Sequence, residues 1–315
     1  MSKKTIAVVG ATGMQGGGLV RAILNDSHSE FVVRALTRNV KSDKAASLAK
    51  LGAEVVEADL DNLDSLKNAF RGTYGAFCVT NFWEHHSVEK EMQQAKNMAG
   101  AAKEGGLSHV VWSTLEDTRN WIPLSDERMP TLQGKYKVPH FDGKGASDKY
   151  FVESGVPSTI LLTAFYWDNL LQPGLAPKRG EDSNLVFGLP MGDRKLPGIA
   201  AEDIGKCAYG IFKKGKELAG KKVGISGGHL TGSQMAEGMS TVLGEPVKYF
   251  PVPFDMFRSF DFPGADDMGN MFQFKHDFEE YYCGARNLDF SRSVNPDLLT
   301  FDNWLAKYGK MIPRT

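Results

Sequence analysis

The sequence has little cysteine and no excess charge of either sign, and it lacks long apolar runs. The 315 residues include three cysteines (Cys78, Cys207 and Cys283), whose spacing matches neither a disulfide framework nor a zinc site. Lys and Arg number 37 against 38 Asp and Glu, whereas a nucleic-acid-binding protein normally shows a basic excess. No apolar run approaches about 18 residues, so we expect neither a membrane span nor a leader. We therefore expect a cytoplasmic protein, with access to the nucleus, that binds neither nucleic acid nor membrane.

The first 165 residues alternate between short apolar segments and amphipathic ones. The predicted strands are rich in β-branched residues and span 5–10, 31–38, 53–60, 74–82, 109–114 and 157–163. Helices are predicted between them, with Asn62 capping the helix at 63–72. Near-continuously apolar strands joined by helices are typical of a parallel sheet covered on both faces. The pattern predicts an α/β fold with a Rossmann-like, doubly wound parallel sheet.

The regular alternation ends near residue 165. Shorter strands and helices follow, at 185–190, 201–215, 221–227, 230–244, 246–253 and 300–309. We divide the chain into a sheet domain over 1–165, to which about 200–230 return, and a smaller α+β lobe over 166–315. The Phe- and Met-rich segment 254–274 of that lobe is a substrate pocket, a partner-binding face or plain core.

A glycine-rich turn follows the first predicted strand. Glycines stand at every third position of Gly10-Ala11-Thr12-Gly13-Met14-Gln15-Gly16. This spacing permits a tight turn, close approach of the backbone to a pyrophosphate and close packing of the next helix, whose N-terminus offers free N–H donors. Because the turn opens a βαβ unit, we interpret it as a dinucleotide site rather than a plain connection.

The end of the second strand favours NADP(H) over NAD(H). An NAD site places an acidic residue there to bind the ribose 2′-OH, but the sequence reads Thr37-Arg38-Asn39, with Lys41 nearby. Arginine pairs with a 2′-phosphate through two hydrogen bonds and stacks on adenine. Asp59 and Leu60, which end the third strand, would lie beside the adenine, unless Asp59 only caps the next helix.

Several segments in this order resemble the NmrA-like family of atypical short-chain dehydrogenase/reductases, and most closely its redox-sensor subgroup. They are GATGMQGG, LTRN, EADLDN, VTNFWE, HFDGKG, FPGADDMGNMFQF (262–274) and LTFDNWL (299–305). The resemblance implies NADP(H) in a crevice between the Rossmann-like domain and the smaller lobe. It implies that the residues nearest the cofactor include Asn81, Phe82, Trp83, Tyr166, Trp167, Asp168 and Asn169.

The sequence leaves more than one candidate for the catalytic proton donor, because the tyrosine that usually has this role is missing. A typical short-chain dehydrogenase uses a serine and a Tyr-x-x-x-Lys pair, in which the tyrosine protonates the substrate oxygen and the lysine holds the nicotinamide ribose. Here the pair is His140 and Lys144, and Ser113 ends a strand. Either His140 donates the proton, or it only packs at the helix start while Lys144 binds the cofactor. Tyr166 is the other candidate donor.

Two functions fit this sequence. The missing tyrosine favours a regulator that senses the NADPH/NADP+ ratio and binds a regulatory protein or a second copy of itself. The alternative is an NADPH-dependent reductase of a hydrophobic carbonyl, quinone, enone or imine.

Three other features carry no predicted chemistry. The adjacent His85 and His86 have no evident third ligand, so no metal site is predicted. Cys78 lies in a buried strand, where a thiol is inert. Glu116 and Asp117 are expected to be solvated.

Overall fold

A seven-stranded parallel sheet forms the larger half of the computed structural model, which describes residues 2–180 and 182–314. Its strands lie in the order β11-β6-β5-β4-β1-β2-β3. Their bounds are β1 (Lys4–Val8), β2 (Phe31–Thr37), β3 (Glu54–Glu57), β4 (Gly75–Cys78), β5 (His109–Thr114), β6 (Ser158–Leu162) and β11 (Lys222–Gly224). β1 pairs with both β2 and β4, so the strand order reverses at β1. The predicted Rossmann-like, doubly wound fold is confirmed.

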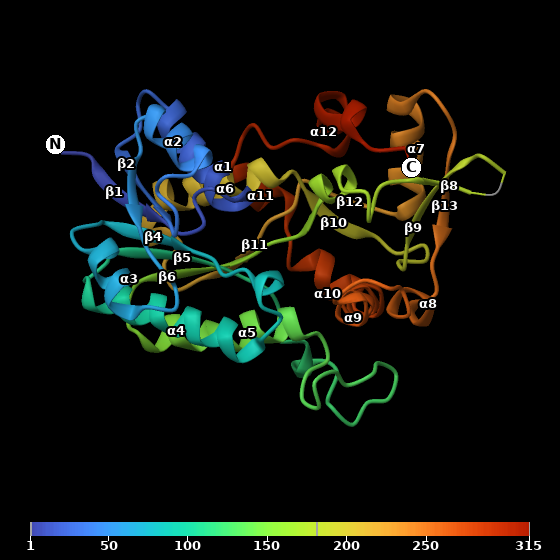
Figure 1. The fold of residues 1–315 in the computed structure, drawn as a ribbon, viewed down its shortest axis with the longest axis horizontal. Coiled ribbons are helices and arrows are strands. Elements are labelled where there is room, and N and C mark those ends of the chain that lie inside the picture. The colour runs from blue at the N-terminus through green and yellow to red at the C-terminus, as the bar shows by residue number, and fades with distance from the viewer. Residues whose placement is uncertain (1, 181, 315) are drawn as a thin grey trace.

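Helices cover both faces of this sheet (Figure 1). One face carries α3 (Leu63–Phe70), α4 (Val88–Glu104) and α5 (Pro139–Glu153), and the other carries α1 (Met14–Asn25), α2 (Asp43–Lys50), α6 (Ala201–Lys214) and α11 (Leu288–Val294). Successive residues of β1 face opposite sides, so Ile6 packs in the core beneath α1 and Ala7 in the core beneath α4. The predicted Asn62 cap of α3 is confirmed, since its Oδ1 accepts a hydrogen bond from the Ser65 N–H at 3.1 Å.

The chain returns to the sheet domain after leaving it. α6 packs so closely on α1 that a Cβ at Gly205 would lie 2.0 Å from the Leu19 nitrogen. β11 then extends the sheet beside β6. Residues 201–224 therefore belong to the layers around the sheet, although a segment of the other lobe, from β7 to β10, precedes them.

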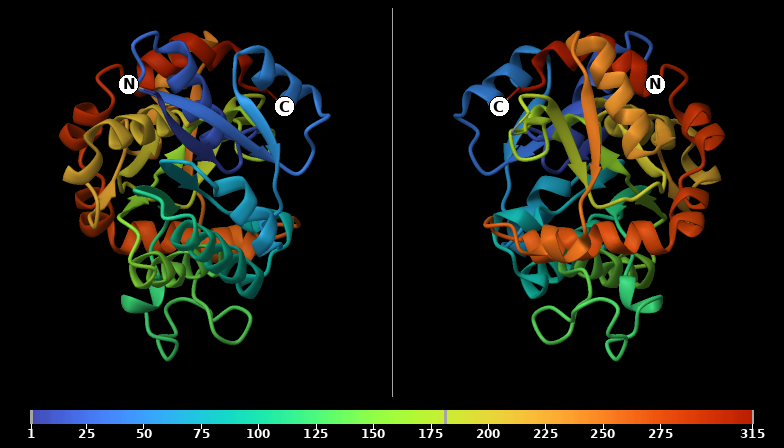
Figure 2. Two further views of the ribbon diagram at one scale, coloured as in Figure 1. Left: turned by 90° about the vertical axis from the view of Figure 1, so that its left-hand side faces the viewer. Right: turned by 90° about the vertical axis from the view of Figure 1, so that its right-hand side faces the viewer.

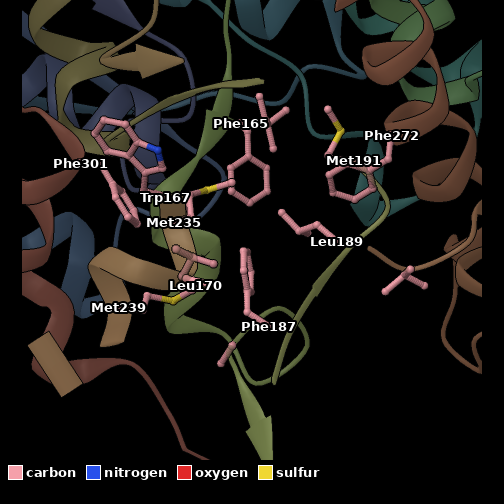
Figure 3. Packing of buried hydrophobic residues seen from close by; sticks show 14 of the residues in the cluster. Phe165, Trp167, Leu170, Phe187, Leu189, Met191, Met235, Met239, Phe272 and Phe301 are labelled. Atoms are coloured by element: carbon pink, nitrogen blue, oxygen red, sulfur yellow. The ribbon is translucent and has the colours of Figure 1, made fainter. Parts of the chain in front are cut away.

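The smaller lobe combines two three-stranded sheets with short helices. One sheet contains β7 (Phe165–Tyr166), β10 (Leu196–Ile199) and β12 (Gly228–Leu230), and the other contains β8 (Lys178–Arg179), β9 (Leu185–Leu189) and β13 (Val247–Pro251). Its helices are α7 (Gly232–Leu243), α8 (Phe254–Arg258), α9 (Ala265–Asp277), α10 (Glu279–Gly284) and α12 (Phe301–Tyr308). Their apolar side chains form one core, in which Phe187, Met235 and Met239 surround Leu170 (Figure 3).

Short 3₁₀ turns complete the chain. They are η1 (Phe82–Glu84), η2 (Thr118–Asn120), η3 (Trp167–Leu171), η4 (Gly215–Glu217) and η5 (Gly309–Met311). Among the residues described, no helix is both long and apolar enough to cross a bilayer.

A buried ion pair joins the two halves. The Arg286 guanidinium donates to both carboxylate oxygens of Glu116, at 2.8 and 3.1 Å, and to the Thr163 carbonyl oxygen at 2.7 Å. Both charged side chains are fully buried. The expectation that Glu116 is solvated was wrong, since Glu116 is buried against Arg286. No local pattern indicates this pair, because the two residues are 170 positions apart in the sequence. The two halves also meet where α9 packs alongside α5, as both views of Figure 2 show.

Candidate functional site

A cleft of about 940 Å³ runs along the carboxyl ends of the parallel strands. The loops after β1, β2, β3, β4 and β6 line it together with the end of β5, and α9 and α10 contribute to its other wall. Because the strand order reverses at β1, the cleft lies at the topological switch point where open α/β sheets bind ligands. Most of the site residues that the sequence predicted line it.

The glycine-rich turn forms the floor of the cleft beside β1. Gly10 has a positive φ of 63°, and a Cβ at Gly16 would lie 2.5 Å from the Gly10 carbonyl oxygen. α1 begins after Gly13 with no side-chain cap and no acidic residue in its first turn. Its first N–H groups are therefore free to bind an anion, and the residues present fit a pyrophosphate. Ala11 is buried beneath the turn and does not line the cleft.

The residues after β2 and β3 form one end of the cleft. Thr37, Arg38, Asn39, Asp59 and Leu60 all line it. Asp59 does not cap α3; its Oδ1 accepts a hydrogen bond from the Asp61 N–H at 2.9 Å. The side chain of Lys41 is exposed outside the cleft, and Lys44 of α2 lines the cleft instead.

Arg38 is paired across this end of the cleft. Its guanidinium donates a hydrogen bond to the Glu84 carboxylate of η1, and this contact raises the pKa of Arg38. The Arg38 side chain is 65% exposed and that of Glu84 is 44% exposed. An anion that binds Arg38 must therefore compete with Glu84, a partner that the sequence did not indicate.

Gln15 connects the glycine-rich turn to the middle of the cleft. Its Oε1 accepts a hydrogen bond from the Ser113 hydroxyl at 2.7 Å, and its Nε2 donates to the Tyr166 hydroxyl oxygen at 2.6 Å. Burial raises the pKa of Tyr166 to about 12, so its hydroxyl keeps its proton at neutral pH. Asn81, Phe82, Trp83 and Asn169 line the same stretch of the cleft.

Lys144 is anchored at the wall next to Asn81. Its ammonium donates to the Thr80 carbonyl oxygen at 3.0 Å and to the Thr80 hydroxyl at 2.7 Å, and it lies 2.7 Å from a Glu91 carboxylate oxygen. Glu91, from α4, is fully buried. The lysine therefore has a fixed position, and neither Thr80 nor Glu91 was predicted to hold it.

His140 is held by a carboxylate from α9. Its Nδ1 lies 2.6 Å from Asp267 Oδ1, and its backbone N–H donates to Asp267 Oδ2 at 3.1 Å. With Nδ1 bound to a carboxylate, Nε2 is the ring nitrogen left for another partner. The ring also packs on Trp83, with centroids 4.8 Å apart. His140 thus both packs at the start of α5 and lines the cleft. This position is compatible with a role as proton donor and with a packing role alone.

Trp167 and Asp168 lie outside the cleft. The chain turns into η3 after β7, which directs Trp167 into the core of the smaller lobe, 5.3 Å from the Phe301 ring between centroids (Figure 3). Asp168 Oδ2 accepts a hydrogen bond from the Ala201 N–H at 2.7 Å, at the start of α6. Neither residue therefore lines the cleft, and their implied approach to the nicotinamide stays a prediction.

One end of the cleft is apolar and borders the smaller lobe. The side chains that make it so are Phe141, Phe165, Leu175, Met268, Met271 and Phe272. The segment 254–274 was expected to form a substrate pocket, a partner-binding face or plain core. Its residues Met268, Met271 and Phe272 line the cleft, whereas Phe257 and Phe274 lie in the core of the smaller lobe. Lys275 and Tyr282, which line the same end, were not predicted.

A family model covers nearly the whole chain. The NmrA-like family model matches residues 2–305. The chain belongs to the NmrA-like family. Among curated relatives, it is 30% identical over 294 residues to an NmrA-like family domain-containing oxidoreductase, FrzB, of a Cladobotryum species, a match that covers 85% of this chain and 83% of FrzB.

Solved structures share the fold at lower identity. The transcriptional regulator NmrA in complex with NADP superposes with a TM-score of 0.76 at 22% identity, over 98% of this chain and 95% of NmrA. NmrA has also been solved with NAD. The Citrobacter sp. triphenylmethane reductase complexed with NADP(H) superposes with a TM-score of 0.75 at 21% identity, over 96% and 99% of the two chains. The fold therefore occurs in both a regulator and a reductase.

Proposed function

We propose that this NmrA-like protein is an NADP(H)-dependent reductase of hydrophobic carbonyl compounds. The observation that carries the proposal is the apolar end of the cleft, formed in part by Phe165 and Phe272, next to Lys144, His140 and Tyr166. Regulation by a bound dinucleotide requires no such pocket, whereas a reductase must bind a second molecule beside its cofactor. The name of the relative FrzB, an oxidoreductase, agrees with the proposal.

The start of α1 and the side chain of Lys144 have the chemistry to hold the cofactor. The free N–H groups at the start of α1 suit its pyrophosphate, and Lys144 suits the hydroxyls of its nicotinamide ribose. Bound and reduced, the nicotinamide supplies a hydride. Tyr166, protonated at neutral pH, and His140, oriented by Asp267, are the candidate proton donors within the cleft.

The choice of NADP(H) rests on Arg38. A guanidinium suits a 2′-phosphate better than a ribose hydroxyl because it matches the phosphate in charge and geometry. Asn39, Ser42 and Lys44 line the same end of the cleft and add polar groups around that position.

A regulator is the second candidate function. The ion pair of Arg38 with Glu84 favours it, because a bound 2′-phosphate would release Glu84 and change η1. A protein partner or a second copy of the chain could then distinguish the two states.

The experiment combines calorimetric titration of NADPH with oxidation of NADPH at 340 nm against aldehydes, enones, quinones and imines. We expect tight binding and turnover with at least one compound class. Lys144→Ala should abolish turnover, while Lys149→Ala, an exposed lysine on the same helix, should leave it unchanged. Tight binding without any turnover would favour the regulator, and absence of binding would overturn both functions.

A further inference from the structure

Lys275 is a buried lysine that forms no ion pair with any residue in the described ranges 2–180 and 182–314. Only 3% of the residue is exposed, and it lines the apolar end of the cleft from α9. Among the described residues no carboxylate lies within ion-pair distance of its ammonium, and its one hydrogen-bond acceptor is the sulfur of Met271 at 3.2 Å. A buried charge is costly without a partner. A purely structural role therefore does not explain why a lysine occupies this position.

Aromatic rings partly compensate for the missing counter-ion. The Lys275 ammonium lies 5.4 Å from the ring centroids of Phe141 and Phe272 and 5.5 Å from that of Tyr282. Such cation–π contacts stabilise an ammonium but accept no conventional hydrogen bond. The three N–H donors of Lys275 thus face rings, one weak sulfur acceptor and the cleft.

Tyr282 is a second polar group at this end that lacks a partner. The residue is 1% exposed and lines the cleft, and its hydroxyl has no hydrogen-bond partner within the described part of the chain. The Arg286 guanidinium contacts the face of its ring, at 3.5 Å from the centroid, but is itself bound to Glu116. Two buried donors from neighbouring helices therefore border one apolar pocket without an oxygen acceptor.

We propose that Lys275 and Tyr282 bind the oxygen of a flat, conjugated carbonyl compound whose ring system fills the apolar end of the cleft. This inference rests on the proposed function and specifies its substrate class. One carbonyl oxygen accepts a hydrogen bond from each side chain, which satisfies both donors at once. Phe141 and Phe272 line this end and make the surroundings of the rest of the molecule apolar.

The charges around the pocket support binding of an electron-rich oxygen. Burial, with a smaller contribution from the positive charge of Arg286, lowers the pKa of Lys275 to about 7. Glu116 opposes this shift but is occupied by Arg286. An oxygen that gains negative charge during reduction would be stabilised by the Lys275 ammonium, and that stabilisation is stronger in a site shielded from water.

The test uses 4-nitrophenol, whose phenolate oxygen on a flat ring stands in for the carbonyl oxygen of a substrate as it gains negative charge, and measures its binding by the shift of its absorbance. Titrations use cofactor-free protein and protein saturated with NADP+. The variants are Lys275→Met, Tyr282→Phe and, as the matched control, Lys248→Met, which removes an exposed lysine of the same lobe. A second measurement needs no variant: acetylation of each lysine of the wild type is mapped by mass spectrometry with and without 4-nitrophenol.

We expect Lys275→Met to weaken 4-nitrophenol binding at least tenfold and Tyr282→Phe to weaken it less. The Lys248→Met control and the NADPH dissociation constant of every variant should stay within twofold of wild type. 4-Nitrophenol should slow acetylation of Lys275 and not of Lys248. Equal binding by Lys275→Met, no saturable binding by the wild type, or unprotected Lys275 would overturn the inference. Absence of NADPH binding would instead overturn the proposed function, since the phenol titration on cofactor-free protein is independent of it.

Discussion

Arg38 and Glu84 should affect NADPH affinity in opposite directions. In the structure the two side chains bind each other at the end of the cleft that suits the adenosine part of a dinucleotide. Arg38→Gln removes the group proposed to bind the 2′-phosphate. Glu84→Gln removes the carboxylate that competes for Arg38 and would repel the phosphate. NADH, which lacks the 2′-phosphate, should respond far less to either change.

The exposure of the pair sets the size of both effects. A hydrogen bond to a charged group contributes roughly 1.5–3 kcal/mol, and the 65% exposure of Arg38 places this contact at the low end. Arg38→Gln should therefore weaken NADPH binding about tenfold, the equivalent of about 1.4 kcal/mol. An exposed ion pair contributes about 0.2–1 kcal/mol, so Glu84→Gln should tighten NADPH binding by about 1.4-fold to fivefold.

Calorimetric titrations of both cofactors with the wild type and the two variants measure these effects. Because the groups are exposed, both differences should shrink as the salt concentration rises. Equal weakening of NADPH and NADH by Arg38→Gln would refute the assignment of Arg38 to the 2′-phosphate. Weaker NADPH binding by Glu84→Gln would refute the competition between the carboxylate and the phosphate.

Two further predictions concern the buried charges beside the pocket. Glu116→Gln leaves Arg286 buried without a counter-ion and should lower the free energy of unfolding in urea by about 3–5 kcal/mol; Glu116→Leu combined with Arg286→Met should cost less, and an equal or larger loss in the double variant would contradict this. The folded protein binds fewer protons at Lys275 than the unfolded chain between pH 7 and 10.5. Wild-type stability should therefore rise with pH across that window, by at most about 5 kcal/mol relative to Lys275→Met. Parallel pH profiles of the two proteins would show that Lys275 titrates normally.

Much of the fold was predictable because its determinants are local. The apolar run before Gly10, the glycine spacing and the Asn62 cap each act within a few residues, and the structure has the corresponding strand, turn and helix. The strands of the smaller lobe are harder to predict. β7 has two residues and β12 has three, too few to show an alternating pattern, and their pairing with β10 depends on distant parts of the chain.

The site was predictable only where one segment carries both the motif and its geometry. Arg38 directly follows a strand, so its position at the cleft followed from the strand itself. Asp267 belongs to a segment that resembles the family, but its contact with His140 spans 127 residues and leaves no local pattern. Lys275 stands in the last turn of α9, where a lysine normally indicates an exposed position. Its burial depends on aromatic rings from α5 and α10.

Transfer of deuterium tests the central claim, that the cleft supports hydride transfer to a carbonyl carbon, most directly. The protein is incubated with NADPH deuterated at one face of the nicotinamide C4 and with the best aldehyde of the panel, and the alcohol is analysed by mass spectrometry. Carbon-bound deuterium from only one of the two C4 isotopomers would show stereospecific transfer in a fixed site, as the account predicts. Oxidation of NADPH without deuterium in the product, or no product from any compound, would contradict it.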